Sequence, residues 1–464
     1  MMFISEAANC MHGECLGDAN TWITSVGSDT RQLNKGALFF ALKGEHFNGN
    51  DYAQQAIDNG AVAVVIDDAT CLVRPAILVK DALIALGDLA QAWRAQFDLA
   101  VIGVTGSNGK TTVKDMIAAI FAAHTQDKST VLATIGNLNN NIGMPMTLLN
   151  IRKQHAFAVI EMGMNHLQEI DYLTHIAKPT VAVITNAGTA HIGELGSRDN
   201  IAQAKGEIYA GLDADGIAII NADDDYANYW QTLQHGKKVI TFGLNAVGSD
   251  KAAHISASTT EIDGVNHVQL HTPNGHVSFT LNLLGKHNVV NALAASAVAV
   301  ALDISNVNIA LGLSHFGAVK GRLQRKNGMN GATLIDDTYN ANPDSMKAAI
   351  DVLANHSGAK IFVMGDMAEL GDASADMHKE IGAYAKQKGI TQLFAMGDMT
   401  AHSVQAFGAQ ALHFSALQDC VTAAAKTMQK DVTVLVKGSR FMQMERAVDA
   451  LEQKQTANGL PGDK

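Results

Sequence analysis

Short apolar runs alternate with helix-compatible stretches along most of the chain. In its middle part, the runs at residues 101–104, 156–160, 181–184 and 216–220 are apolar almost throughout. Strands that are apolar on both faces are typical of a parallel sheet covered by helices on either side. The middle part is therefore predicted to be an α/β domain with a mostly parallel central sheet.

The segments before and after this part repeat the alternation. The first predicts a small α/β domain, because strand-like runs at 37–42 and 61–66 enclose a helical stretch at 52–59 that Gly60 ends. The last predicts a doubly wound, Rossmann-like α/β domain. Its expected strands lie at 333–335, 360–364, 392–395 and 432–436, and its expected helices include 343–354 and 374–389.

The connecting segments set the expected domain boundaries. A helix at 82–97 leads into the first strand of the middle part, and a more polar β segment at 252–283 carries a turn signal at Pro273-Asn274-Gly275. A small-residue helix at 288–302 follows it. The three predicted domains are residues 1–84, 85–316 and 317–464.

Composition narrows the class of protein. The chain has 464 residues, 47% of them apolar, and a net charge of −11, without the basic footprint that nucleic-acid binding needs. Its longest apolar stretch, at 292–302, is too short to span a bilayer, and no charged secretory start is present. The four cysteines are scattered and suggest neither zinc nor disulfides. We expect a cytoplasmic protein without membrane insertion.

The segment at 105–112 is the strongest chemical signal. A strand-like run precedes it and a helical stretch at 113–121 follows, so its glycines form a strand-to-helix turn that directs backbone N–H groups at one anion. Lysine and threonine in such a turn suit a triphosphate and its Mg²⁺. ATP and Mg²⁺ are therefore expected at Gly106, Ser107, Asn108, Gly109, Lys110, Thr111 and Thr112.

One position departs from the common phosphate loop. Val104 stands where that loop has its first glycine, five residues before Gly109. The alternative is an ordinary strand-to-helix turn that carries a lysine by chance.

Three charged or titratable residues follow the expected strands. Glu161 ends the run at 156–160, at the sheet edge where ligands collect, and is a candidate Mg²⁺ ligand or else a helix-capping carboxylate. His191 follows the next strand and is a weaker candidate, since a lone histidine is usually structural. Lys205 lies on an expected helix and on spacing alone belongs to a solvated helix face.

Two polar clusters are candidate ligand contacts. Asn137 and Asn140 belong to a loop of four asparagines that either builds a turn or binds phosphate or sugar groups. In the last domain, Asp336 and Asp337 begin a polar segment that runs to Pro343, where the alternative is a helix cap.

Together these segments resemble the Mur ligases, the ATP-dependent amide-forming enzymes of peptidoglycan precursor synthesis. The resemblance covers essentially the whole chain, and the family uses the same phosphate loop with Val104 included. The motifs that carry it are Glu161-Met-Gly163, Thr185-Asn186 with His191, Ala204-Lys-Gly-Glu207 and the segment 287–293.

Within the family, the last domain is most similar to the member that adds D-alanyl-D-alanine to UDP-N-acetylmuramoyl-tripeptide. The segment 337–343, with Tyr339, Asn340 and Asn342, matches that member, as do 363–371 and 437–440. The member that adds the third amino acid would carry Tyr-Ala-His-Thr-Pro near 339–343. The resemblance thus implies an ATP-dependent ligase that acts through an acyl phosphate, with these two molecules as substrates and the chain acting as a monomer.

The resemblance also implies roles for single residues. Catalysis falls to Lys110, His191 and Lys205, a lysine that can be carbamylated in the family, and the Mg²⁺ ligands are Thr111, Glu161 and His191; the sequence does not show whether Lys205 is modified. Asn288, Asn291, Arg322 and Asp337 would contact the nucleotide. Substrate contacts are expected from Ser28, Thr30, Arg31, Asn137, Asn140, Tyr339, Asn340 and Asn342.

Two other functions stay open from the sequence. The nearer alternative is another Mur-type or folylpolyglutamate-type amide ligase. The more distant one is a phosphate-loop kinase or a nucleotide-binding regulator without chemistry. The sequence does not distinguish a tripeptide that ends in lysine from one that ends in diaminopimelate.

Overall fold

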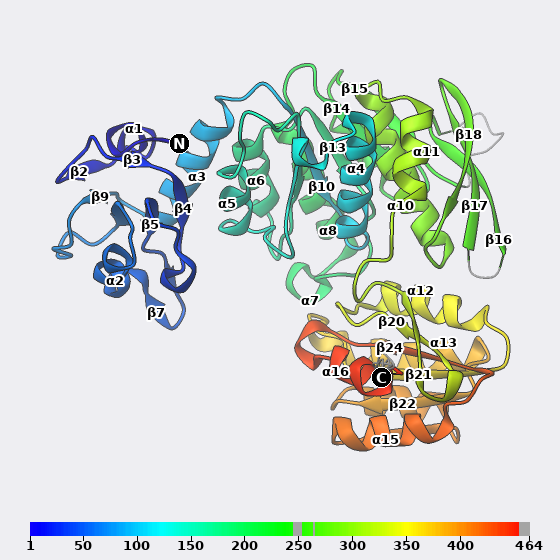
Figure 1. The fold of residues 1–464 in the computed structure, drawn as a ribbon. Coiled ribbons are helices and arrows are strands. Elements are labelled where there is room, and N and C mark those ends of the chain that lie inside the picture. The colour runs from blue at the N-terminus through cyan, green and yellow to red at the C-terminus, as the bar shows by residue number, and fades with distance from the viewer. Residues whose placement is uncertain (245–252, 263–264, 454–464) are drawn as a thin grey trace, which may run out of the picture.

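Three α/β domains follow one another along the chain in the computed structural model, which describes residues 1–244, 253–262 and 265–453 (Figure 1). The central domain joins the other two. The expectation of three α/β domains is confirmed.

The N-terminal domain is built on a five-stranded sheet. Its strands lie in the order β2 (Glu14–Leu16), β9 (Ala76–Leu78), β8 (Ala63–Ile66), β5 (Ala37–Phe40) and β4 (Ser25–Gly27). All neighbours are parallel except β2, which pairs antiparallel with β9 at the edge. The remaining elements are α1 (Ile4–Cys10), α2 (Ala53–Asp58) and the short pairs β1 (Met2–Phe3) with β3 (Trp22–Ile23) and β6 (Lys43–Gly44) with β7 (Phe47–Asn48).

Helix α3 (Ala82–Arg94) connects the N-terminal and central domains. Asp81 caps its first turn, since its carboxylate accepts hydrogen bonds from the N–H groups of Leu83 and Ile84. At the other end, the Trp93 indole donates to the Ile151 carbonyl of the central domain at 3.1 Å. The predicted boundary after residue 84 thus falls within this helix.

The central domain contains a six-stranded sheet in which every neighbouring pair is parallel. The strand order is β11 (Val131–Ala133), β12 (Phe157–Glu161), β10 (Ala100–Thr105), β13 (Val181–Ile184), β14 (Ile217–Asn221) and β15 (Lys238–Phe242). Its helices are α4 (Lys110–Thr125), α5 (Gly143–Leu148), α6 (Glu169–Ala177), α7 (Ile192–Leu195), α8 (Arg198–Gly206), α9 (Ala227–Thr232), α10 (Lys286–Ala301) and α11 (Asn306–Ser314).

Two hydrophobic cores cover the two faces of this sheet, because alternate residues of its apolar strands point to opposite sides. Ile102 and Val183 pack with α4, α10 and α11 on one face. On the other face, Ile160 and Ile184 belong to a core that continues through Leu86 and Trp93 of α3 into the N-terminal domain. The N-terminal and central domains therefore share one core.

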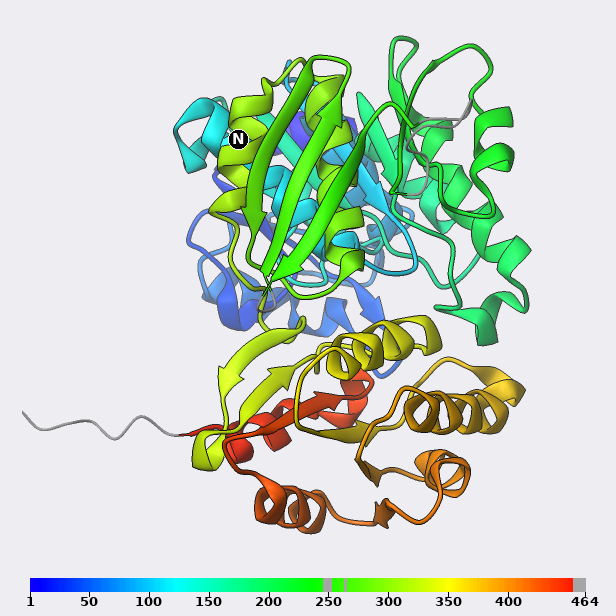
Figure 2. The ribbon, with the colours of Figure 1, turned by 90° about the vertical axis from the view of Figure 1, so that its right-hand side faces the viewer.

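A three-stranded antiparallel sheet packs on α10 and α11, and Figure 2 shows its strands lying over these helices. It consists of β16 (Ser256–Ile262), β17 (Val265–Thr272) and β18 (Gly275–Leu281). Thr272 pairs with Gly275 across the turn that Pro273-Asn274-Gly275 predicts. The described part of the predicted β segment at 252–283 is thus confirmed; residue 252 and residues 263–264 lie outside the described residues.

The C-terminal domain contains the second doubly covered sheet. Its strand order is β19 (Gln324–Asn327), β20 (Thr333–Asp336), β24 (Val432–Lys437), β21 (Ala359–Gly365), β22 (Gln392–Met396) and β23 (Ala411–Phe414), parallel except for β19. The helices are α12 (Pro343–Ala354), α13 (Ser374–Gln387), α14 (Thr400–Phe407), α15 (Leu417–Thr427) and α16 (Glu445–Leu451).

Separate cores lie on the two faces of this C-terminal sheet. Ile335 and Phe362 pack with α12 and α13 on one side, and Val434 and Val363 pack with α15 and α16 on the other. Within the described residues, no helix is both long and apolar enough to cross a membrane.

Candidate functional site

A cavity of about 1620 Å³ lies where the carboxyl ends of the central strands face the C-terminal domain. The parallel arrangement explains this position, because loops that follow parallel strands gather at one edge of the sheet. Most of the predicted site residues line it. They are Ser107, Asn108, Gly109, Lys110, Thr111, Thr112, Asn137, Asn140, Glu161, His191, Asn288, Asn291, Arg322, Asp337, Tyr339, Asn340 and Asn342.

The phosphate loop connects β10 to α4 and has the backbone that its glycines require. Gly106 and Gly109 have φ values of 152° and 83°, in the region that favours glycine. A side chain at Gly106 would collide with the Thr185 hydroxyl, and one at Gly109 would collide with the Asn291 amide. The loop can therefore approach its neighbours only because these positions lack a Cβ atom.

Asn186 and Thr185, which follow β13, hold the phosphate loop in place. The Asn186 side-chain oxygen accepts a hydrogen bond from the Asn108 N–H at 3.0 Å, and the Thr185 hydroxyl donates to the Asn108 carbonyl at 2.6 Å. The loop is thus fixed by its neighbours, which preorganises its remaining N–H groups for an anion.

Two lysines lie at this loop, the half-buried Lys110 and the buried Lys205. Lys110 Nζ donates to the Gly106 carbonyl at 2.6 Å, and burial lowers its pKa, although the nearby Glu161 carboxylate opposes this shift. Burial, helped by the positive charge of Lys110, lowers the pKa of Lys205 well below its ordinary value. Among the described residues, Lys205 Nζ has no hydrogen bond or ion pair. The solvated helix face that spacing suggests for Lys205 is wrong, because the side chain is buried against the sheet.

Glu161 is the last residue of β12, and one of its carboxylate oxygens is unused. Its N–H donates to the Thr134 hydroxyl at 2.9 Å, and Oε1 accepts a hydrogen bond from the Asn139 side chain at 2.8 Å. Oε2 is buried and has no partner within the described part of the chain. A buried carboxylate oxygen without a donor is costly unless a ligand completes it, and a cation is the ligand that suits it.

The asparagine loop builds a turn and lines the cavity. Asn140 builds a turn, since its side-chain oxygen accepts hydrogen bonds from the N–H groups of Ile142 and Gly143. Asn139 orients Glu161, and Asn137 lines the cavity. The turn accounts for the Asn140 side-chain oxygen, and all four asparagines of the loop line the cavity.

His191 precedes α7 and contacts the C-terminal domain. Its Nδ1 lies 2.8 Å from Oε2 of Glu369, and the Gly193 N–H donates to the Glu369 carbonyl at 3.0 Å. The close contact with His191 lowers the pKa of the Glu369 carboxyl, against the effect of its partial burial, although the two groups lie outside hydrogen-bond geometry. Among the described residues, no three His, Cys, Asp or Glu side chains form a preformed metal cluster. A cation here would therefore also need hydroxyl or phosphate oxygens.

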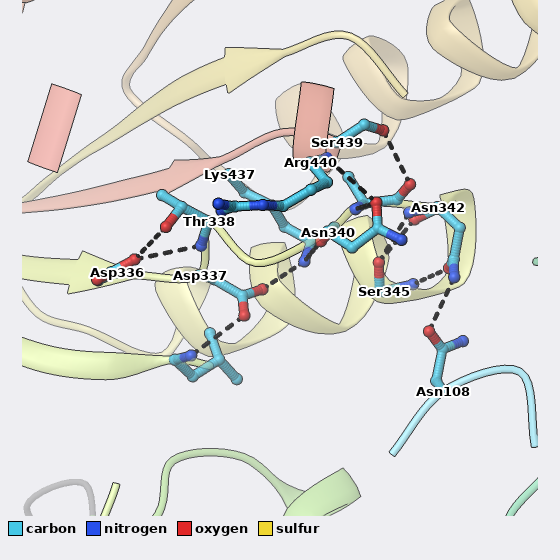
Figure 3. Close-up of polar contacts among 12 residues, drawn as sticks. Asn108, Asp336, Asp337, Thr338, Asn340, Asn342, Ser345, Lys437, Ser439 and Arg440 are labelled. Carbon is cyan, nitrogen blue, oxygen red and sulfur yellow. Dashed lines mark hydrogen bonds and ion pairs between the residues drawn. The ribbon is translucent and has the colours of Figure 1, made fainter. Parts of the chain in front are cut away.

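The C-terminal wall of the cavity is a connected polar network (Figure 3). Lys437 Nζ pairs with Asp337 at 2.6 Å and donates to the Asn340 carbonyl at 2.9 Å. Both side chains are largely buried, and burial lowers the pKa of Lys437 while Asp337 opposes that shift. The network holds the segment 337–342 rigid at the end of β20.

Four contacts join this wall to the central domain. Asn342 donates to the Asn108 side chain at 2.8 Å (Figure 3), and Asp344 accepts hydrogen bonds from both the N–H and the hydroxyl of Thr189. Arg322 donates to the Thr111 hydroxyl at 3.2 Å, and the His191–Glu369 pair is the fourth. All four of these contacts involve the phosphate loop or the loop after β13.

Arg322 and the α10 asparagines complete the nucleotide side of the cavity. The Arg322 guanidinium lies 4.1 Å from the centre of the Tyr339 ring, and its Nε is buried without a partner in the described structure. Asn291 donates to the Asn288 side chain at 3.0 Å at the start of α10.

Some predicted residues do not line the cavity. Ser28, Thr30 and Arg31 lie in the N-terminal domain, where Arg31 is exposed and pairs with Asp29. Gly106 and Lys205 lie behind the cavity wall.

Sequence reasoning assigned no role to five residues that the geometry makes important. Glu369 and Lys437 stand in segments that carried the family resemblance, and Asp344 follows Pro343. Asn139 and Asn186 were visible only as members of asparagine-containing motifs.

Comparison with protein families matches parts of all three domains to Mur ligase domains. Residues 104–299 match the Mur ligase middle domain, residues 321–440 match the Mur ligase glutamate ligase domain, and residues 22–94 match the Mur ligase family catalytic domain.

Relatives of similar length match the whole chain. The UDP-N-acetylmuramoyl-tripeptide–D-alanyl-D-alanine ligase of Escherichia coli is 39% identical, over 98% of this chain and 99% of its own. The ligase of the same name from Haemophilus influenzae is 38% identical, over 97% and 98% of the two chains.

Solved structures agree with this. MurF from Acinetobacter baumannii superposes with a TM-score of 0.90 at 35% identity, over 97% of this chain and 98% of that one. MurF ligase from Thermotoga maritima in complex with ADP gives 0.82 at 25% identity, over 92% and 96%.

Proposed function

The chain belongs to the Mur ligase family, and we propose that it uses ATP to join UDP-N-acetylmuramoyl-tripeptide to D-alanyl-D-alanine. The chain is a ligase, and the amide that it forms completes the nucleotide-linked pentapeptide precursor of peptidoglycan. The observation that carries the proposal is the shared cavity, in which the phosphate loop and Glu161 face the ion pair between Asp337 and Lys437. Cell-wall growth, and with it cell shape and division, depends on this precursor.

The reaction has two chemical steps. The terminal carboxylate of the tripeptide attacks the γ-phosphorus of ATP, which forms an acyl phosphate and releases ADP. The amine of D-alanyl-D-alanine then attacks the acyl carbon, loses a proton and expels phosphate. Because two anions meet in the first step, the protein must mainly neutralise charge. Lys110 and the N-terminus of α4 are placed for that task.

The site fits a phosphate-bound Mg²⁺. Glu161 has a buried oxygen without a partner, Thr111 offers a hydroxyl in the phosphate loop, and His191 lines the same cavity. These are oxygen and nitrogen donors of the kind that would hold Mg²⁺ beside a triphosphate. When bound, the cation would supply positive charge to the phosphate oxygens.

Lys205 fits the proposed carbamate. Carbon dioxide reacts with a neutral amine, and burial lowers the pKa of this lysine well below its ordinary value. The resulting carbamate would carry negative charge near Lys110. If so, short carboxylic acids should partly restore the activity of Lys205→Ala, and they should not stimulate the wild-type enzyme.

The C-terminal wall and the N-terminal domain divide the remaining contacts. Arg322, Asp337, Asn288 and Asn291 surround the nucleotide side of the cavity, while Asn137, Asn140, Tyr339, Asn340 and Asn342 face the peptide substrates. Ser28, Thr30 and Arg31 hold the UDP end of the long substrate. Arg31 supports this role because its guanidinium is exposed and can reach a diphosphate.

We further propose that the enzyme acts as a monomer in the cytoplasm. A single chain supplies both walls of the cavity, so no second copy is needed to complete it. ATP and the nucleotide precursor are cytoplasmic metabolites.

One assay tests the proposal. Phosphate release is measured with ATP and Mg²⁺ in the presence of UDP-N-acetylmuramoyl-tripeptide, D-alanyl-D-alanine, or both. Release should require both substrates. A kinase would release ADP without an amine and leave a stable phosphorylated product, a regulator would bind ATP without turnover, and another ligase of the family would prefer a different amine. Turnover that is indifferent to the dipeptide would contradict the proposal.

A further inference from the structure

The amine substrate brings an anion of its own into the cavity. D-alanyl-D-alanine reacts through its amine and keeps a free carboxylate at the other end. A carboxylate that leaves water needs a cation or several N–H donors in place of its hydration. Because two extended residues span about 7 Å, this carboxylate stays close to the reacting amine and therefore within the same cavity.

Most lysines and arginines that line the cavity already have partners in its walls. Each of the following donates to a backbone carbonyl, a hydroxyl or a carboxylate: Lys110, Arg198, Arg322 and Lys437. Two others, Lys320 and Arg440, also line the cavity. Lys320 is exposed and lies two residues before Arg322, on the nucleotide side. Arg440 lies on the C-terminal wall and has no role in nucleotide binding.

The backbone that carries Arg440 is fixed just after β24. The N–H of the buried Ser439 donates to the Asp366 carbonyl at 2.9 Å, and its hydroxyl accepts a hydrogen bond from the Ala368 N–H at 2.7 Å. Arg440 follows Ser439 and lies beside Asn340 (Figure 3), whose side-chain oxygen accepts a hydrogen bond from the Arg440 N–H at 3.4 Å. The arginine side chain thus starts from an ordered part of the wall.

One edge of the Arg440 guanidinium is unused. Nη1 pairs with Glu445, the first residue of α16, at 3.0 Å. Nε and Nη2 have no hydrogen bond or ion pair with the rest of the described chain. These two nitrogens form an edge that can bind a carboxylate through two parallel hydrogen bonds.

The pair with Glu445 does not block a second carboxylate. A guanidinium has five N–H donors in a fixed plane, so it can serve two carboxylates at different edges. The Arg440 side chain is 65% exposed, which leaves the free edge accessible from the cavity. Glu445 instead limits the orientations of the ring, because it holds the Nη1 end.

We propose that Arg440 binds the terminal carboxylate of D-alanyl-D-alanine and thereby makes the enzyme select an amine that carries a free acid at its other end. This role rests on the proposed function, because it takes the dipeptide as the second substrate. Arg440 holds the dipeptide on the C-terminal wall while its amine faces the acyl phosphate at the phosphate loop.

The test compares D-alanyl-D-alanine with D-alanyl-D-alaninamide, which has the same amine but no carboxylate. Phosphate release is measured with ATP, Mg²⁺ and UDP-N-acetylmuramoyl-tripeptide at saturation, and kcat/KM is determined for each amine. The wild type should prefer the free acid by roughly 10–100-fold. Arg440→Gln should lose this preference by using the acid less well, while it uses the amide as well as the wild type does. Arg440→Lys should keep part of the preference, since it retains the charge but not the paired donors.

The controls separate substrate binding from a structural role. Arg446→Gln removes an exposed arginine of α16 outside the lining of the cavity and should change kcat/KM for neither amine. In Arg440→Gln, the KM values for ATP and for the UDP-tripeptide should stay unchanged. If Arg440 acted only through its pair with Glu445, Arg440→Gln would lower the rate with both amines alike and keep the preference, which would overturn the proposal. Loss of the preference in Lys320→Gln instead of Arg440→Gln would also overturn it.

The same assay distinguishes failure of this role from failure of the proposed function. A wild type that does not release phosphate with both substrates would contradict the proposed function itself. A wild type that releases phosphate but uses the acid and the amide equally well would leave the proposed function intact and show that Arg440 does not select the carboxylate.

Discussion

The central and C-terminal sheets present their carboxyl ends to the same cavity but treat their polar side chains in opposite ways. At the central edge, Glu161 Oε2 and Lys205 Nζ have no partners among the described residues. At the C-terminal edge, Asp337 and Lys437 pair at 2.6 Å and are further bonded to backbone groups. The central edge lacks groups that a ligand would supply, whereas the C-terminal edge is organised before any ligand arrives.

The largest expected effect comes from removing the positive charge of Lys110 at the central edge. Lys110→Ala should lower turnover by roughly 1000-fold, equivalent to about 4 kcal/mol of transition-state stabilisation, because two anions would then meet without it. Phosphate release measures this, and circular dichroism checks the fold. Lys379→Ala, at an exposed position of α13, is the control. More than a few per cent of residual activity would refute the assigned role of Lys110.

The second effect is on stability and concerns the C-terminal edge. Lys437→Met leaves Asp337 buried without its partner and should lower the free energy of unfolding by about 3 kcal/mol. Urea unfolding measures it. Lys388→Met, which breaks the exposed pair with Asp351, should cost much less, because water and salt screen an exposed ion pair. Equal losses would remove the contrast between an organised buried edge and a surface pair.

These two edges also show what the sequence could and could not predict. The phosphate loop was predictable because strand, glycine turn and helix are contiguous in sequence, and Glu161 because it ends an apolar run. Pro343 marked the start of α12 in the same local way, with Asn342 as its cap. Local patterns therefore located each wall of the cavity separately.

The contacts between the walls were not predictable from pattern. His191 and Glu369 are far apart in sequence, and neither has a periodic or spacing signal that points to the other. Lys205 looked like a solvated helix residue because the local pattern does not show which helix face packs on the sheet. Such pairings depend on how domains dock, and short-range propensities contain no information on that.

The third expected effect is a pH dependence of stability that arises from the buried amine of Lys205 at the central edge. The folded-state pKa of Lys205 lies below its ordinary value of 10.5, so the unfolded chain binds more protons between the two values. The burial cost is fully present below the folded-state pKa and falls as the pH rises toward 10.5, by up to about 1.4 kcal/mol per pH unit. The stability of the wild type relative to Lys205→Met should thus rise with pH.

Unfolding is measured for both proteins from neutral to alkaline pH, in buffer freed of carbon dioxide so that no carbamate forms. Taking the difference cancels the titration of the other lysines. A difference that does not change with pH would mean that Lys205 titrates normally in the folded protein.

The smallest expected effect is a gain in stability, in contrast to the loss expected for Lys437→Met. Glu161→Gln keeps the shape of the side chain and its bond from Asn139, but removes a buried charge whose Oε2 has no partner. The unliganded protein should gain about 1 kcal/mol of stability while losing activity. Thermal unfolding without Mg²⁺ or nucleotide measures the gain. A loss of stability would show that the central edge is as well satisfied as the C-terminal one.

The hydrophobic core that runs through α3 has a consequence for how the molecule unfolds. Leu86 and Trp93 belong to the same core as residues of both the N-terminal domain and the central sheet, whereas the cores of the C-terminal sheet lie within that domain apart from a few bordering residues. Residues that share a core tend to lose their structure together. The three domains should therefore behave as two cooperative units, with residues 1 to about 316 melting as one and the C-terminal domain as the other.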